Sequence, residues 1–230
     1  MFMKKVIIIL FIFIFMCQPV FARAGGGSSS GGGSRGHSSH TSSPHTSSTR
    51  QGGSPIAGVL GAGGCLMMML YWKRHKAKKM HQEIVDDIKT AYQQDTFWDE
   101  KVLKKKVEEQ YFKIQKAWSK QDLTTLKLCL SDALYERWQL KMEWQQYQNQ
   151  QNVLDNIQLF KVILVDLYDD IDNHQDYFWV YIEGKMNDTM VQDEQIIESH
   201  HDTFVEYWKF IRYGDDILLD EIKQQDEVES

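Results

Sequence analysis

The chain has 230 residues, with 26 Lys and Arg against 32 Asp and Glu, and every acidic residue lies beyond residue 82. Residues 83–230 hold 16 basic and 32 acidic side chains, a formal charge of −16. So acidic a part repels nucleic acid, which argues against a DNA- or RNA-binding protein. The three cysteines show no spacing typical of a disulfide framework or a metal site, and we predict neither a metal nor a cofactor.

Residues 1–22 have the pattern of a secretory signal peptide. Lys4 and Lys5 precede an apolar run, and small residues follow at Ala22 and Ala24. The alternative is an uncleaved first membrane helix, although the run is short for one. Residues 23–55 are rich in Gly, Ser, Thr and His, which bury little apolar area, so we predict a flexible segment there.

Residues 56–72 contain no charged residue and are predicted to form a transmembrane helix, at the short end of the usual range. A basic cluster follows at 73–79, and such positive flanks stay on the cytoplasmic side. Whether or not the signal is cleaved, this orientation places the C-terminal domain in the cytoplasm. We expect a single-pass protein of the cell membrane that contacts lipids through its span; the alternative is a secreted chain.

Residues 73–96 are predicted to be a basic juxtamembrane stretch followed by a connecting helix. Asp99 to Lys120 is the clearest helix, because apolar residues recur every three or four positions. Asp122 and Ser131 are placed to cap two further helices. The last of these is expected to bury one face and to leave Leu140 and Trp144 off it. The polar stretch 145–152 is predicted to fray into a connection.

Alternating patterns then predict strands at 157–167, 177–186, 204–212 and 217–222. On the first strand, one face is expected to carry Ile157, Leu159, Ile163, Val165 and Leu167. Helices followed by a meander of strands predict an α+β domain over 97–226. Its sheet is expected to be mostly antiparallel, with the helices packed on one face.

Two groups of residues resemble a known family. Phe112-x-Ile114-Gln115-x-Ala117-Trp118 and the Asp122 and Leu130-Ser131 motifs after it are similar to the opening helices of the mitochondrial import-motor tether, the forty-four-kilodalton subunit of the inner-membrane translocase. Glu206-x-Trp208-x-Phe210-x-Arg212 resembles a strand motif of the same C-terminal domain. The two groups fall in the same order as in that family.

The resemblance implies a fold similar to nuclear transport factor 2, in which helices and a curved sheet form a cone with an apolar pocket. It also implies association with a membrane and the binding of a protein or lipid. In the mitochondrial protein, the chaperone-contacting part precedes this domain. Here a Gly/Ser segment and a span take its place, so only the binding function of the domain carries over.

Six aromatic residues are candidates for the lining of such a pocket, with ordinary core packing as the alternative. They are Trp118, Trp138, Trp179, Tyr181, Trp208 and Phe210. Glu206 and Arg212 are candidates for a buried polar pair, since a lone charge in a core is costly. No catalytic residue or metal ligand is assigned.

The function expected from the sequence is that of a membrane-anchored, non-catalytic binding module that assists protein translocation or membrane-protein assembly. The alternative is a small-molecule enzyme of the cone fold that uses a pocket acid or base. Asp166 and Glu206 are the carboxylates considered for that role, while His200 and His201 are expected in a polar loop. Homo-oligomerisation stays open.

Overall fold

A computed structural model describes residues 55–170 and 175–224, with the backbone alone over 55–66. The expected signal peptide at 1–22 and almost all of the Gly/Ser-rich segment lie outside the described residues. The chain divides into two compact units, and the boundary falls inside helix α2 (Pro55–Gln94), between Lys76 and Ala77. No helix in the described part of the chain combines the length and hydropathy of a membrane span, so the span at 56–72 stays a prediction.

The helices of the C-terminal unit begin where the sequence supplies a capping side chain. A short 3-10 helix, η1 (Thr96–Trp98), is capped by Asp95, and α3 (Glu100–Ser119) is capped by Asp99. Asp122 caps α4 (Leu123–Lys127), and Ser131 caps α5 (Asp132–Tyr147). In each case a side-chain oxygen accepts from a free backbone N–H of the first turn, which confirms the two predicted caps.

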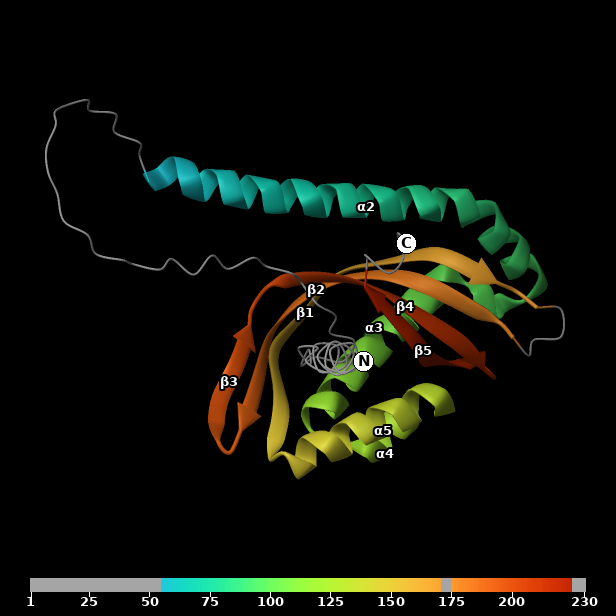
Figure 1. Cartoon of the computed structure of the whole chain (residues 1–230). Coiled ribbons are helices and arrows are strands. Elements are labelled where there is room, and N and C mark those ends of the chain that lie inside the picture. Colours follow the sequence, from blue (N-terminus) through green and yellow to red (C-terminus); the bar gives the residue numbers. More distant parts are fainter. Residues whose placement is uncertain (1–54, 171–174, 225–230) are drawn as a thin grey trace, which may run out of the picture. The chain divides into compact units, whose positions relative to one another are not determined.

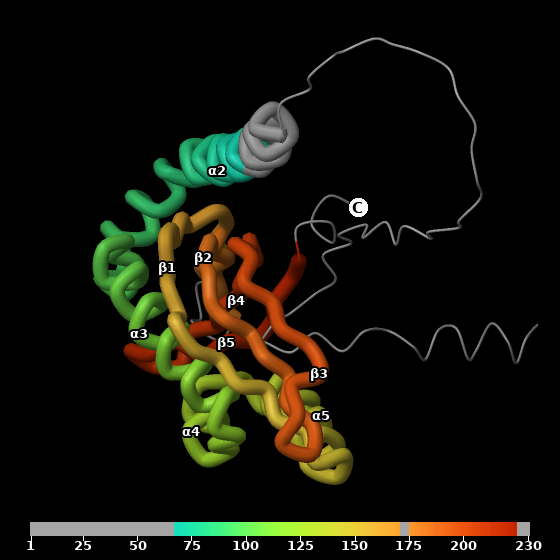
Figure 2. Tube along the Cα trace, turned by 90° about the vertical axis from the view of Figure 1, so that its left-hand side faces the viewer, coloured from blue at the N-terminus to red at the C-terminus, as the bar shows by residue number. Residues whose placement is uncertain are grey.

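Five strands follow, and every strand pair is antiparallel. They are β1 (Gln150–Tyr168), β2 (Tyr177–Gln192), β3 (Gln195–His200), β4 (Thr203–Tyr213) and β5 (Asp216–Gln224). The order across the sheet is β1-β2-β4-β5, and β3 pairs with the end of β2 beyond β4. Figure 1 shows the long strands curving over α3, and Figure 2 shows β3 continuing the sheet beside β2.

The helices cover one face of this sheet and form the core with it, which confirms the predicted α+β architecture. Leu103, Val107 and Tyr111 of α3 are buried against Phe178 and Trp208 of the sheet. The α4–α5 connection is fastened to β5: Ser131 N donates to Leu219 O, and Leu219 N donates to Cys129 O. Burial raises the pKa of the Cys129 thiol in this connection.

Three irregularities in β1 overturn the face predicted for it. Register shifts lie between Asp155 and Gln158, Leu159 and Lys161, and Leu164 and Asp166. Each shift changes which alternate residues point toward the helices. Leu159 therefore packs beside the helix-side core, whereas Ile163 pairs with Tyr181 on the other face.

The polar stretch 145–152 is not a frayed connection, as its composition suggested. Helix α5 continues to Tyr147, and β1 begins at Gln150 after a left-handed turn at Asn149 (φ 53°). Gln145 and Asn152 are buried. Polar side chains in this segment therefore face the interior, and periodicity of apolar residues gave no sign of it.

Strand β3 was also missed, and His200 ends that strand rather than lying in a loop. The turn before it places Asp193 and Glu194 both at positive φ, 48° and 65°. Two successive residues of this kind make the primed turn that joins short hairpins, usually marked by Asn-Gly or Asp-Gly. The sequence Asp-Glu lacks that signal.

Gly184 provides a test of how closely α3 packs on the sheet. A Cβ at this position would lie 2.8 Å from Gln158 O, 2.9 Å from Phe204 Cζ and 3.1 Å from the Tyr111 hydroxyl. Gly184→Ala is expected to lower the free energy of unfolding by about 1–3 kcal/mol through overpacking. Urea unfolding followed by tryptophan fluorescence measures the change.

The control is Gly214→Ala, where an added Cβ meets nothing within 4 Å and only the positive φ of 62° is strained. Its expected cost is about 1 kcal/mol. Unfolding of Gly184→Ala at the wild-type urea concentration would contradict the close packing.

Candidate functional site

Aromatic rings make up much of the interior between α3, α5 and the sheet. Trp118 of α3 meets Trp138 of α5 edge to face, with ring centroids 4.8 Å apart. Tyr111 lies 5.4 Å from Trp208, and Trp208 lies 6.2 Å from Phe210. Four of the six predicted lining residues, Trp118, Trp138, Trp208 and Phe210, are therefore on the helix side of the sheet.

The other two, Trp179 and Tyr181, are on the opposite face. Trp179 of β2 pairs with Lys209 of β4, and Tyr181 pairs with Tyr207. The residues that alternate with them on β2, Phe178, Val180 and Ile182, point to the helices. The rings of Tyr181 and Tyr207 pack edge to face, with centroids 5.8 Å apart. The structure therefore does not bring the six aromatic residues together in one lining.

A chain of buried polar groups runs through the helix-side interior. Trp118 Nε1 donates to Asn152 Oδ1 over 2.7 Å, and Asn152 Nδ2 donates to Asp188 Oδ1 over 2.6 Å. The Lys141 ammonium stands 5.0 Å from the centre of the Trp118 ring. Desolvation by burial lowers the pKa of Lys141, and the charge of Asp188 opposes this effect.

Two glutamine amides in the same layer lack partners. Gln115, between Tyr111 and Trp118 on the buried face of α3, is 0% exposed. Neither its Oε1 nor its Nε2 has a hydrogen-bond partner in the described part of the chain. Gln145 lies one turn beyond Lys141 on α5, is 1% exposed, and its Nε2 likewise has no partner among described residues. Such groups cost stability unless something satisfies them.

Glu206 and Arg212, expected as a pair, are given different partners. The Glu206 carboxylate accepts from Trp208 Nε1 over 2.9 Å and from Gln224 Nε2 over 3.2 Å. Along a strand, six residues span roughly 20 Å, which holds the two side chains apart. Arg212 instead contacts Asp95 at 2.6 Å and Asp176 at 3.1 Å. Glu206 is buried and Arg212 is half-buried, and each has its own hydrogen-bond partners rather than the other residue.

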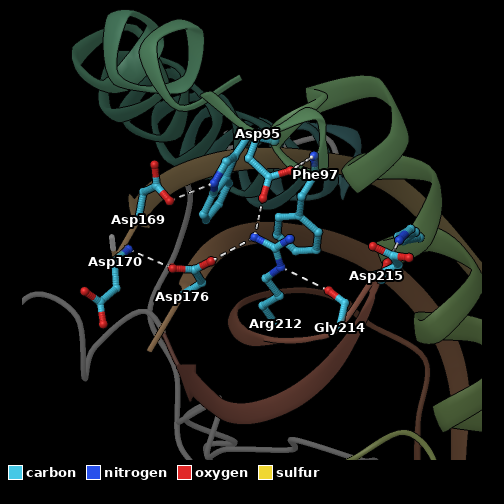
Figure 3. Close-up of polar contacts among 10 residues, drawn as sticks. Asp95, Phe97, Asp169, Asp170, Asp176, Arg212, Gly214 and Asp215 are labelled. Carbon is cyan, nitrogen blue, oxygen red and sulfur yellow. Dashed lines mark hydrogen bonds and ion pairs between the residues drawn. The ribbon is translucent and has the colours of Figure 1, made fainter. Parts of the chain in front are cut away.

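Arg212 and the side chains around it form a compact cluster at the end of the sheet (Figure 3). We call Arg212, Asp95, Asp176 and Phe97 the Arg212 cluster. The guanidinium lies 4.2 Å from the centre of the Phe97 ring, and its Nε donates to Gly214 O over 3.0 Å. The Asp176 side chain is fully buried, and its second oxygen accepts from Asp170 N over 2.7 Å.

The cluster joins three parts of the chain that are far apart in sequence. Asp95 and Phe97 come from the connection between α2 and α3, Asp176 precedes β2, and Arg212 is the next-to-last residue of β4. Nearby, Trp98 Nε1 donates to Asp169 Oδ1 over 3.0 Å. Sequence reasoning missed Asp95 and Asp176, because no local spacing links them to Arg212.

The carboxylates considered for catalysis lie in different surroundings. Asp166 is exposed and pairs with Trp179 on the face away from the helices, although desolvation raises the pKa of its carboxyl. Glu206 is buried, with the two donors given above. His200 Nε2 contacts Glu198 at 2.8 Å, with both side chains partly exposed. The structure does not bring Asp166 and Glu206 together.

Removing the charge of Arg212 tests whether the Arg212 cluster stabilises the domain. Arg212→Met leaves the buried Asp176 carboxylate without its cation, so the free energy of unfolding should fall by about 3–5 kcal/mol. Adding Asp176→Asn should recover part of the loss. Lys89→Met, which removes an exposed pair with Asp86, is the control and should change stability by less than about 1 kcal/mol. If Arg212→Met and Lys89→Met changed the free energy of urea unfolding by the same amount, this role would be contradicted.

The Asp95 carboxylate predicts a pH dependence. The hydrogen bond from Phe97 N is the largest cause of the lowered pKa of Asp95; burial opposes it, and the hydrogen bond and charge of Arg212 add to the lowering. A lowered folded-state pKa contributes stability above the unfolded value, and this stability is lost as pH falls through the folded value. Wild type should therefore lose stability below about pH 4. Asp95→Asn should be less stable at pH 7, and its difference from wild type should narrow below pH ~4; a constant difference from pH 7 to pH 3 would contradict the assignment.

A search among curated proteins found no match. Twenty-four chains of solved structures match, among them the intermembrane space region of chloroplast protein ARC6, with a TM-score of 0.42 and 11% identity over 55% of this chain and 95% of that one. The family described as Tim44-like domain matches residues 85–224, more than half of the chain. The chain therefore belongs to the Tim44-like domain family, as the sequence resemblance predicted.

Proposed function

We propose that this protein is a membrane-anchored, non-catalytic binding module that receives a protein or lipid partner between α3, α5 and the sheet. It would assist protein translocation or membrane-protein assembly. Membership of the Tim44-like family supports this function, because that family is generally a binding or tether domain and is associated with membranes. In this proposal the domain binds the partner, and the identity of the partner determines which process the protein assists.

The observation that carries the proposal is the Gln115 amide, which is fully buried and finds no hydrogen-bond partner among the described residues. An amide fully buried in an aromatic core costs about 1–3 kcal/mol when both its donor and its acceptor are unsatisfied. A leucine at this position would fill similar space without that cost. A polar group that weakens the free protein is explained if a bound partner provides the missing hydrogen bonds.

Lys141 and Asp188 extend the polar character of this interior. Burial lowers the pKa of the Lys141 ammonium, so its protonated form is held at a cost, while Asn152 fixes the Asp188 carboxylate. Ligand sites combine mainly apolar walls with a few such polar groups. Trp118, between Lys141 and Asn152, supplies the apolar wall at the same point.

Anchoring in the cell membrane, with the domain on the cytoplasmic side, is part of the same proposal. In α2, Tyr71 and Trp72 are exposed, and the basic cluster at 73–79 follows directly. Aromatic rings beside lysines are typical of the boundary between lipid and water on the cytoplasmic side. The proposal rests on this pattern and on the uncharged run before it.

No specific contact favours catalysis by a pocket acid among the described residues. Glu206, the candidate on the helix side, already accepts hydrogen bonds from Trp208 and Gln224. These two hydrogen bonds engage both oxygens of the Glu206 carboxylate in contacts within the domain. We therefore do not propose the enzyme alternative.

Gln115→Leu in the full-length protein tests the interior site. The variant should be as stable as wild type or more stable, by up to about 3 kcal/mol, because two unsatisfied polar atoms are removed. At the same time it should lose its partner. Chemical crosslinking in alkali-washed membranes, with identification of attached proteins, and mass spectrometry of co-purified lipids measure that loss.

Gln146→Leu, on the exposed side of α5, is the matched control and should retain the partner. Recovery of neither a protein nor a lipid above the background of membranes lacking the chain would count against the proposal. So would an unchanged yield from the Gln115→Leu variant.

A further inference from the structure

Helix α5 carries a second apolar surface that stays exposed in the part of the chain that the structure describes. Its buried side is made by Leu134, Met142 and Gln145. Leu140, Trp144 and Tyr147, four and three residues apart, are 67%, 59% and 81% exposed. This spacing places them on one side of the helix. We call these three residues the α5 stripe.

The α5 stripe is ordered by its own contacts. The rings of Trp144 and Tyr147 stack with centroids 5.9 Å apart and planes 28° apart. Two exposed aromatic rings fixed against each other lose little conformational entropy when a partner covers them, and Trp and Tyr are enriched among residues that dominate binding energy. The feature is therefore a suitable anchor for another molecule.

Acidic side chains border one edge of the stripe. Glu136 and Glu143 are both exposed and are seven residues apart, which places them on the same edge two turns apart. Gln139 Nε2 donates to Glu143 Oε1 over 2.9 Å and holds that carboxylate in place. The surface is thus an apolar band with Glu136 and Glu143 along one edge and a single cation, the exposed Arg137, along the other.

This charge pattern decides between occupants. In an antiparallel pairing of two copies about Leu140, residues of the same edge meet, so Glu136 would lie beside Glu143 of the other copy. Like charges in that position are unfavourable. An anionic membrane surface is disfavoured for the same reason, because carboxylates beside the rings would be repelled by the headgroups.

We propose that the α5 stripe binds an amphipathic helix of a partner protein whose apolar face is flanked by Lys or Arg. Helices of this kind dock on apolar surfaces through residues at steps of three and four, with complementary charges at the rim. The apolar face covers Leu140, Trp144 and Tyr147, and the cationic edge meets Glu136 and Glu143. The site is separate from the interior around Gln115, so the failure of either proposal leaves the other standing.

The test uses the full chain in phosphatidylcholine nanodiscs with a photo-crosslinking residue at position 147. The first probe is a biotinylated helical peptide of about five turns (~18 residues) whose leucines line one face and whose flanks are lysine. The second probe has glutamate in place of every lysine. We expect saturable crosslinking of the lysine peptide and about tenfold less of the glutamate peptide.

The charge-reversal variant Glu136→Lys/Glu143→Lys should exchange this preference, with the lysine peptide about tenfold weaker and the glutamate peptide captured instead. The same crosslinker at position 196 of β3, where Ile196 is also exposed, and discs without protein are the controls. Equal capture of both peptides, capture that ignores the charge reversal, or crosslinking of one copy to another would each overturn the proposal.

Discussion

The ion pairs of Arg212 with Asp95 and Asp176 join the segment that precedes α3 to the end of the sheet. Asp95 is the last residue before η1, and the same carboxylate that caps this turn holds the guanidinium. Because the Asp176 side chain is fully buried, removal of Arg212 would leave a buried carboxylate without this cation. This contact joins the connection before α3 to the end of β4, and so it helps to hold α3 over the sheet.

The interior itself is a compromise between packing and polarity. Aromatic rings supply most of its buried surface, yet Gln115, Gln145 and Lys141 are placed among them at a cost in stability. Proteins commonly retain such costs where binding requires them. The outer side of α5 shows the complementary case, since Leu140, Trp144 and Tyr147 expose apolar area that the fold could have buried or replaced.

Local patterns predicted the helices and the fold class, because capping residues and apolar periodicity act within a few positions. Asp122 and Ser131 cap the helices they were assigned to, and Leu140 and Trp144 lie off the buried face. The faces of β1, the strand β3 and the partners of Arg212 could not be predicted in this way. They depend on bulges, on two residues at positive φ without glycine, and on contacts between distant segments. The six aromatic residues proposed to line a pocket are split between the two faces of the sheet. Trp179 and Tyr181 alternate along β2 with the residues that face the helices, so they lie on the opposite face.

The covered sulfur of Cys129 has a consequence for the chemistry of the folded domain. Burial favours its protonated form, and the protonated form is a poor nucleophile toward disulfides and peroxides. Its neighbours Ser131 and Leu219 hold the surrounding backbone in place without any crosslink. In the folded domain this thiol is thereby poorly available to oxidants and disulfides, and backbone hydrogen bonds fasten the α4–α5 connection to β5.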